Sequence, residues 1–227
     1  MNNTEIKKLL IKEADEKYKN FSASLLPGVN NVLGVRLPKL RKLAKEIYKS
    51  DWKNFLNSNC EYLEETLLQA MVIGLIKDTP EKILNYVEKF IPSINNWSIC
   101  DCFCCSLKFV QSNKDIVWDF LQQFKKSNKE YEIRFVLVMF LNYFIDKKYL
   151  KEVFQIIDNY SYGNYYSMMG AAWLISICFI KYPDETMDFL KTTAIDNRTF
   201  NKSIQKIIES RQVDKETKNN LKKMKRL

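Results

Sequence analysis

Amphipathic segments of helical length follow one another along most of the chain, with only short breaks between them. Within each segment apolar residues recur at helical spacing, which is typical of a helix with one buried face. Glycine and proline number only five each among 227 residues, which disfavours turn-rich β folds. Start signals and periodicity predict helices at about 4–20, 39–48, 51–57, 60–78, 80–92, 96–112, 114–126, 129–146, 148–160, 164–182, 184–192, 197–211 and 214–225.

One strongly apolar helix recurs at intervals of roughly 30 to 40 residues, around Ala70, Asp101, Arg134 and Trp173. The connections are short, so successive helices should be antiparallel neighbours. A two-helix unit repeated at this period is typical of a helical solenoid, whose inner helices line a concave surface. We therefore expect one all-α domain over 1–227, a C-shaped helical-repeat solenoid with Asp101, Arg134 and Trp173 on one surface.

The N-terminal part of the chain is less regular than the rest. Thr4 can cap a first helix that runs to about Asn20. The stretch 21–37 contains one proline and two glycines and is typical of a loop or a broken helix. Pro38 then fits the first turn of the next predicted helix, because a helix start needs no N–H from its first residues.

The chain carries an excess of positive charge and contains no histidine. Lys and Arg number 36 against 27 Asp and Glu, for a formal charge of +9. This excess favours a polyanion partner, such as DNA, RNA or an anionic membrane surface, and an ordinary solvated surface explains it equally well. The absence of histidine excludes His-based triads, histidine general bases and zinc sites that need imidazole.

The composition also limits the location and the cofactors that we expect. No run of about 18 apolar residues is present and the N-terminus is polar, so we predict no membrane span and no secretion signal. Most of the six cysteines lie in one predicted helix, which fits buried thiols in a reducing cytoplasm. On a helix only Cys100, Cys104 and close neighbours share a face, and no Gly-rich phosphate loop occurs, so we expect no metal and no cofactor.

Two residues stand out in the apolar segment 94–110. Trp97 and Asp101 lie four residues apart and would share one face of a helix. A carboxylate on a mostly apolar helix is costly unless it is hydrogen-bonded or used. Asp101 is therefore either a bonded group at a helix junction, which is the commoner case, or a functional carboxylate.

Arg134 and Trp173 present the same choice farther along the chain. Arg134 lies in the apolar segment 133–140, so its guanidinium must be paired, with Asp101 as the structural candidate, or must bind a phosphate in a groove. Trp173 follows small residues, and alone such a ring is more often core than site. Three tyrosines lie just upstream of it, Tyr162, Tyr165 and Tyr166.

Cations gather around the start of the predicted helix 39–48. Arg36 precedes the helix, and its outward positions are occupied by Lys39, Arg41, Lys42 and Lys45. Such a cluster at a helix entrance can bind phosphate, and a solvated face is an equal alternative. Lys202 is a further candidate DNA-binding residue.

Four passages occur in a fixed order along the chain. They are Gly34-Val35-Arg36-Leu37-Pro38 followed by Leu40-Arg41-Lys42-Leu43, Asn96-Trp97 with Asp101, Arg134 in its apolar helix, and Gly170-Ala171-Ala172-Trp173 followed by Tyr182-Pro183-Asp184. In these passages the chain resembles the AlkD family of DNA alkylation repair glycosylases, which are built from HEAT-like repeats. The resemblance covers about 34–208, most of the chain.

The resemblance implies a HEAT-like solenoid with a basic concave groove that removes cationic N3- or N7-alkylated purines from duplex DNA. The family's catalytic carboxylate falls on Asp101, its two site tryptophans on Trp97 and Trp173, and its phosphate-contacting arginine on Arg134. Such a base already leaves readily, so no general acid is needed, and a carboxylate can stabilise the charge developing on the sugar. Indole faces also stabilise a cation, and the family is thought to act without flipping the base into a pocket.

The N-terminal region departs from the family pattern. Active members carry a second N-terminal helix that contacts DNA near the lesion, whereas here a single helix at about 4–20 is predicted. The chain therefore resembles a branch that keeps the site residues and lacks this helix.

Three hypotheses of function follow. The first is a cytoplasmic, monomeric DNA glycosylase that acts on alkylated duplex DNA. The second is a non-catalytic relative that binds DNA or structured nucleic acid. The third is a scaffold for protein interactions, which is the commonest use of helical solenoids.

Overall fold

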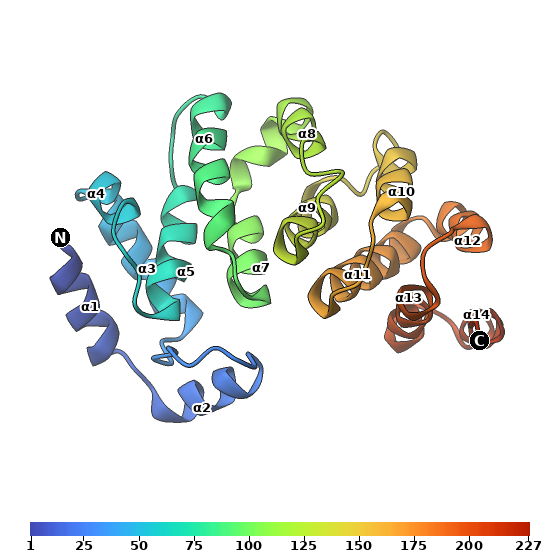
Figure 1. The fold of residues 1–227 in the computed structure, drawn as a ribbon, viewed down its shortest axis with the longest axis horizontal. Helices are drawn as coiled ribbons and strands as arrows, with labels where there is room; N and C mark the ends of the chain where they lie inside the picture. The colour runs from blue at the N-terminus through green and yellow to red at the C-terminus, as the bar shows by residue number, and fades with distance from the viewer. The chain divides into compact units, whose positions relative to one another are not determined.

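The computed structural model describes all 227 residues, and every regular element in it is a helix (Figure 1). The chain forms 14 α-helices and two short 3-10 helices. The all-α fold predicted from the sequence is confirmed.

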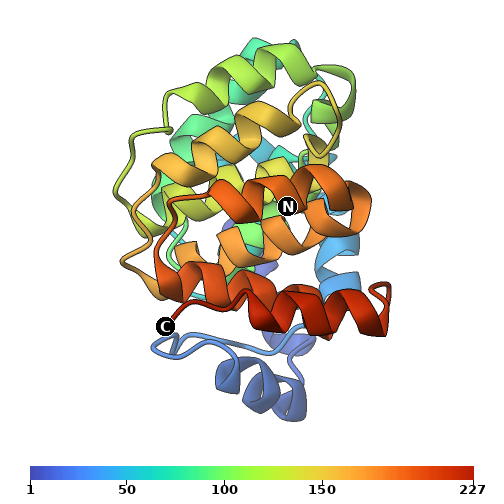
Figure 2. The same cartoon turned by 90° about the vertical axis from the view of Figure 1, so that its right-hand side faces the viewer.

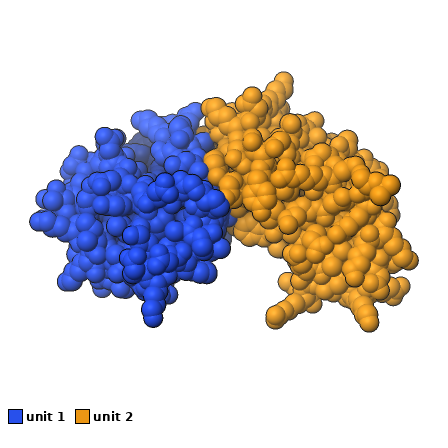
Figure 3. Space-filling model, turned by 60° about the horizontal axis from the view of Figure 1, so that its bottom comes forward, with its two compact units in different colours: residues 1–113 blue, residues 114–227 orange.

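The chain divides into two compact units, residues 1–113 and residues 114–227, which Figure 3 colours separately. Unit 1 contains α1 (Asn3–Lys12), α2 (Glu16–Ser24), α3 (Leu37–Tyr48), α4 (Trp52–Leu56), α5 (Leu63–Ile73), α6 (Pro80–Phe90), η1 (Ile91–Ser93), α7 (Trp97–Ser106) and η2 (Lys108–Ser112). Unit 2 contains α8 (Lys114–Gln122), α9 (Glu130–Tyr143), α10 (Leu150–Asn159), α11 (Tyr165–Lys181), α12 (Pro183–Thr192), α13 (Asn197–Glu209) and α14 (Lys215–Lys223). A single domain over 1–227 and a C-shaped groove stay predictions.

Each unit is built as a row of packed helices with partner helices beside it. In unit 1, α5 packs between α3 and α7, and α4 and α6 also contact α5. In unit 2, α11 packs between α9 and α13, while α12 contacts α11 and α14 contacts α13. Figure 2 turns the C-terminal helices α13 and α14, drawn in red, toward the viewer. This is the helical-repeat arrangement that the recurring apolar segments predicted.

The central helices of both units are apolar on nearly every side because other helices cover them. Almost all residues of α5 are buried, and in α9 and α11 most are. A helix that is covered all round is expected to be apolar all round. The starts of the helices are also as expected: Pro38, Pro80 and Pro183 each lie in the first turn of a helix.

The N-terminal region differs from its prediction. A single helix over 4–20 capped by Thr4 is wrong, because α1 begins after Asn2 and α2 begins separately after Asp15. The Asp15 carboxylate accepts the N–H of Tyr18 at 3.0 Å and so caps α2. Aspartate is favoured at such a cap and disfavoured inside a helix, which explains the break. The second N-terminal helix is therefore present, and it takes up the first part of the stretch 21–37, which was predicted as a loop or broken helix.

A buried carboxylate holds the segment that follows α2. Glu64, only 2% exposed, accepts the backbone N–H groups of Leu33, Gly34 and Val35 at 2.7–3.2 Å. Gly34 has a φ of 87°, and a Cβ there would lie 2.5 Å from the carbonyl oxygen of Asp15. Only glycine satisfies both the dihedral angle and the close approach. The loop is thereby fixed against the beginning of α2.

Candidate functional site

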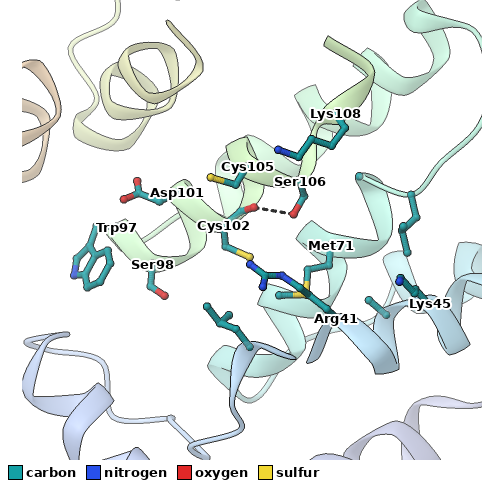
Figure 4. A pocket seen from close by; sticks show the side chains of 14 residues that line it. Arg41, Lys45, Met71, Trp97, Ser98, Asp101, Cys102, Cys105, Ser106 and Lys108 are labelled. Atoms are coloured by element: carbon teal, nitrogen blue, oxygen red, sulfur yellow. Dashed lines mark hydrogen bonds between the residues drawn. The ribbon is translucent and has the colours of Figure 1, made fainter. Parts of the chain in front are cut away.

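A pocket of about 680 Å³ opens in unit 1 among α3, α5 and α7 (Figure 4). This volume lies within the usual range for small-ligand sites, roughly 300–1,000 Å³. Its polar lining consists of one carboxylate, one indole, two thiols, two hydroxyls and three cationic side chains. The cations are Arg41, Lys45 and Lys108. Such a pocket can receive a flat, positively charged group and hold anionic groups around it.

Helix α7 places Trp97 and Asp101 on the wall of this pocket. The Asn96 side chain accepts the N–H of Ile99 at 3.0 Å, which fixes the helix start so that Trp97 is its first residue. Asp101 follows one turn later, and both side chains are half-buried. The opposite face of α7, including Phe103, lies in the core. The predicted shared face of Trp97 and Asp101 is therefore present, and it faces the pocket.

The indole of Trp97 is tied to the N-terminal helices. Its Nε1 donates a hydrogen bond at 3.0 Å to the carbonyl oxygen of Leu25, the C-cap residue that follows α2. This bond joins residues 72 positions apart in the sequence. The ring orientation in the pocket thus depends on α2, the helix that the sequence-based prediction did not find.

The cations around α3 do not form one cluster. Arg41 lines the pocket with Asp101, whereas Lys39 and Lys42 line a separate hollow against α1. Lys39 also makes an ion pair with Glu13, the residue that follows α1. The structure therefore brings only one of these three predicted DNA-binding residues into the pocket.

Arg36 faces a different direction again. Its guanidinium bonds the Asp15 carboxylate at 2.9 Å and lies over the ring of Tyr18, 4.8 Å from the centroid. Both contacts hold the loop before α3 to α2. Arg36 therefore has a structural role that its position in the sequence did not indicate.

Two further cations line the pocket. Lys45, one of the outward cations of the predicted helix 39–48, lies one helical turn after Arg41 and so shares its face of α3. Lys108 begins η2, two residues after the end of α7. Lys108 was not predicted as a site residue, because only the fold places it beside Asp101.

Two thiols of α7 also line the pocket. Cys102 and Cys105 form a C-x-x-C pair. The prediction from the sequence considered Cys100 and Cys104 as the residues that share a face, and it did not identify this pair. Burial raises the pKa of the Cys102 thiol to about 11, so this group is protonated near neutral pH. All six cysteines are free thiols, and no three His, Cys, Asp or Glu side chains are grouped to hold a metal ion.

In unit 2, Arg134 is 6% exposed and its Nη1 donates to the carbonyl oxygen of Tyr166 at 2.9 Å. One turn earlier on α9, the Glu130 carboxylate accepts the N–H of the same Tyr166 at 2.6 Å. From the sequence, the candidate partners of Arg134 were the Asp101 carboxylate and a DNA phosphate. The carbonyl oxygen of Tyr166 is a further partner that the sequence did not indicate. Arg134 therefore joins α9 to the start of α11.

Arg134 also lies within electrostatic range of a lysine on α13, Lys206. The pKa of Lys206 is lowered, first by burial and then by the positive charges of Lys202 and Arg134, while Glu209 opposes the shift. Trp173 is half-buried on α11, so the core interpretation of this ring is only partly correct. The fold thus brings Lys206 of α13 within electrostatic range of two predicted residues, Arg134 of α9 and Lys202 of α13.

A family model described as DNA alkylation repair enzyme matches residues 6–218 of the chain. The chain belongs to the DNA alkylation repair enzyme family. The match includes every site residue named above, and DNA is accordingly the partner of this protein. A comparison of the sequence with curated proteins finds no match.

A DNA alkylation repair enzyme acts on a polyanion, and this chain offers cations in both units. Unit 1 has Arg41, Lys45 and Lys108 around Asp101, and unit 2 has Lys202 and Lys206 with Arg134. None of the 14 α-helices of this family member has the length and apolar character needed to cross a membrane.

Proposed function

We propose that this protein is a DNA glycosylase that excises cationic N3- or N7-alkylated purines from duplex DNA. One observation carries the proposal: Asp101 and Trp97 lie on the wall of one pocket whose rim bears Arg41, Lys45 and Lys108. A carboxylate and an indole face suit a cationic base and a cationic sugar. The surrounding cations suit the phosphates on either side of it.

The chemistry needs little beyond these groups. In an N3- or N7-alkylated purine the base carries a positive charge, so it departs as a neutral leaving group when the N-glycosidic bond breaks. Positive charge then develops on the sugar, and the Asp101 carboxylate stabilises it. The same carboxylate orients a water for attack on the sugar carbon and takes its proton. No histidine is required, in agreement with the composition.

Trp97 contributes by its ring face. An indole face stabilises a nearby cation by about 0.5–2 kcal/mol, depending on how dry the contact is. The bond from Nε1 to Leu25 fixes the ring before the base arrives, so less rotational freedom is lost on binding. In unit 2 we assign Trp173 as the second ring and Arg134 and Lys202 as phosphate contacts, by the resemblance to the family.

The presence of α2 supports the catalytic alternative over the non-catalytic one. A branch without activity is expected to lack the second N-terminal helix, whereas in this chain α2 occupies Glu16–Ser24. Its last turn reaches Trp97 through Leu25. We therefore favour the glycosylase over a relative that only binds nucleic acid.

The test is base release from duplex DNA that contains 7-methylguanine, followed under single-turnover conditions. We expect release by the wild type and a rate lower by roughly 10²–10³ in Asp101→Asn, the usual effect of removing one electrostatic group from an active site. Duplex affinity should not fall, because the variant removes a negative charge and leaves every cation of the pocket in place. Asp119→Asn, an exposed position on α8, is the matched control and should keep full activity.

Two results would count against the glycosylase. Release that survives Asp101→Asn would remove this carboxylate from the mechanism. No release by the wild type, with duplex binding retained, would place the protein among the non-catalytic relatives.

A further inference from the structure

Three tyrosines gather where α9 and α11 begin in unit 2. The rings of Tyr131 and Tyr166 stack, with centroids 5.9 Å apart and planes at 26°. The ring of Tyr165 meets Tyr166 edge-on, at 5.2 Å and 81°. Tyr165 is 50% exposed and the other two are half-buried. These three residues, the tyrosine platform, present aromatic surface to the solvent.

Neighbouring tyrosines have a different environment. Tyr160 and Tyr162 are buried, and their hydroxyls donate to the carbonyl oxygens of Phe124 and Ile157 at 3.2 and 2.9 Å. Burial raises the pKa of both hydroxyls above its usual value. These two residues fill the core. The tyrosine platform does not, although Tyr162 and Tyr165 stand close together in the sequence.

The backbone beneath the platform is held on both sides. The Glu130 carboxylate accepts the N–H of Tyr166 at 2.6 Å, and the Arg134 guanidinium donates to its carbonyl oxygen at 2.9 Å. Both charged side chains belong to α9, so they fix Tyr166 relative to Tyr131 on that helix. A platform fixed in this way loses little freedom when a flat ligand stacks on it.

Cations and a further ring accompany the platform. Tyr166 and Trp173 lie seven residues apart, which places them two turns from each other on one face of α11. Arg134 lies one turn from Tyr131 on α9, and Lys206 is within electrostatic range of both Arg134 and Lys202. Aromatic rings among cations are typical of sites that bind unpaired nucleic acid, where the rings stack on bases and the cations contact phosphates.

We propose that the tyrosine platform binds an unpaired nucleobase of DNA by stacking, with Tyr165 as the ring most open to it. Bases inside a duplex stack on each other and expose only their edges in the grooves, so a ring can stack only on a base outside the helix. The site adds an affinity for single-stranded DNA to the proposed glycosylase. It rests on DNA as the partner and does not need the Asp101 chemistry.

The test compares two single-stranded probes by fluorescence anisotropy with the full-length protein. One is a short thymidine oligonucleotide, and the other has the same length and charge but abasic sugars in place of nucleosides. We expect the wild type to bind the thymidine probe more tightly. Tyr165→Ala should weaken that binding roughly fivefold to tenfold, as expected for one stacked base, and leave the abasic probe unchanged.

Two further variants separate stacking from folding. Tyr165→Phe keeps the ring and should bind the thymidine probe as the wild type does. Tyr182→Ala removes a half-buried tyrosine at the opposite end of α11 and should also bind normally. Circular dichroism on each variant checks the helical content.

Three results would overturn the platform: no preference of the wild type for the thymidine probe, no effect of Tyr165→Ala, or an equal effect on both probes. Release of 7-methylguanine from duplex DNA is measured separately with Asp101→Asn. If Tyr165→Ala weakens thymidine binding but the wild type releases no 7-methylguanine, the tyrosine platform is supported and the glycosylase is not. If 7-methylguanine is released but Tyr165→Ala leaves thymidine binding unchanged, the glycosylase is supported and the tyrosine platform is not.

Discussion

The positive charge of Lys206 is less favourable in the folded protein than in water. Its pKa is lowered because the ammonium group is partly buried and because Lys202 and Arg134 carry the same charge. Charging Lys206 is therefore harder in the folded protein than in the unfolded chain. A residue that destabilises the fold and lies among other cations is more readily explained by an anionic ligand than by packing.

Removing this charge should stabilise the protein near neutral pH and reduce the dependence of its stability on pH. We expect Lys206→Met to raise the melting temperature near neutral pH by about 1–3 °C, a small change for a chain of this size. In the wild type the unfolded chain binds more protons than the folded one between the lowered pKa and the ordinary 10.5. Stability should therefore rise with pH across that window, and less so in the variant. Thermal melts from neutral to alkaline pH measure both effects.

Lys222→Met, at an exposed position of α14, is the matched control for Lys206→Met. It removes the same charge and should leave the melting temperature nearly unchanged. A melting temperature that falls in Lys206→Met at neutral pH would show that Lys206 stabilises the fold, against this interpretation.

At the scale of single residues, the sequence predicts what one helix decides by itself. Trp97 and Asp101 share a face because they are four residues apart, and this spacing is visible without a structure. The bond from Trp97 to Leu25 and the position of Lys108 depend on how distant segments pack, and no local pattern indicates them. The role of Arg134 was open for the same reason, since its partner Tyr166 lies 32 residues away.

Gly74 allows α5 and α7 to approach each other closely. It is the C-cap residue that follows α5, and it lines the pocket. A Cβ there would lie 2.5 Å from the carbonyl oxygen of Ser106, the last residue of α7. The obstacle is backbone, which cannot move as a flexible side chain can. The glycine thus sets the distance between α5 and α7.

A methyl group at this position should push the two helices apart. We expect Gly74→Ala to lower the free energy of unfolding by about 1–3 kcal/mol, the usual range for an overpacked contact. Gly163→Ala, where no heavy atom lies within 4 Å of the added Cβ, should change it by less than about 0.5 kcal/mol. Urea denaturation compares the two variants. Equal stability of Gly74→Ala and the wild type would mean that the helices can separate without cost.

Helix positions were predictable wherever a cap or a proline marks the start. The helices from α3 to α14 begin close to their predicted starts, because these starts coincide with breaks in the apolar pattern. Two predicted ends are wrong: the helix predicted over 60–78 ends at Ile73, and the one predicted over 96–112 ends at Ser106 and is followed by a separate 3-10 helix, Lys108–Ser112. The prediction of a single helix over 4–20 was wrong because Asp15 lies inside what looks like one continuous apolar stripe of a helix. Its side chain caps α2 instead of continuing α1, and that choice depends on the loop held by Glu64 and Gly34.

The whole molecule carries a formal charge of +9, and its contact with DNA should depend on salt. Each phosphate neutralised by a cation contributes about 0.9 to the slope of log affinity against log salt concentration. We expect the double variant Lys45→Gln with Lys108→Gln to bind duplex DNA more weakly and to reduce this slope by about 2. Anisotropy titrations over a range of salt concentrations give the slope.

The double variant Lys82→Gln with Lys89→Gln has the same net charge and changes two exposed lysines of α6, neither of which lines the pocket. It should keep the slope of the wild type. If both double variants lower the slope equally, only the net charge matters, and the pocket is not where the phosphates bind.

The helical-repeat architecture can be predicted from the interval at which apolar helices recur, whereas the arrangement of the site residues cannot. Apolar helices recurring at a nearly constant interval predict a row of packed helices, and both units contain such a row. That the cations of 36–42 would face three directions could not be read from the sequence. Each direction is set by a different neighbour, such as Glu13 for Lys39 and Asp15 for Arg36.

Every residue that lines the pocket lies between Leu37 and Lys108, and the carbonyl group that holds Trp97 belongs to Leu25. The ribosome therefore synthesises every residue of the pocket before it begins unit 2, which starts at Lys114. At a synthesis rate of about 5–20 residues per second, the 114 residues from Lys114 to Leu227 take roughly 6–23 s. A nascent chain thus contains its carboxylate, its indole and their supporting segments while unit 2 is still being made.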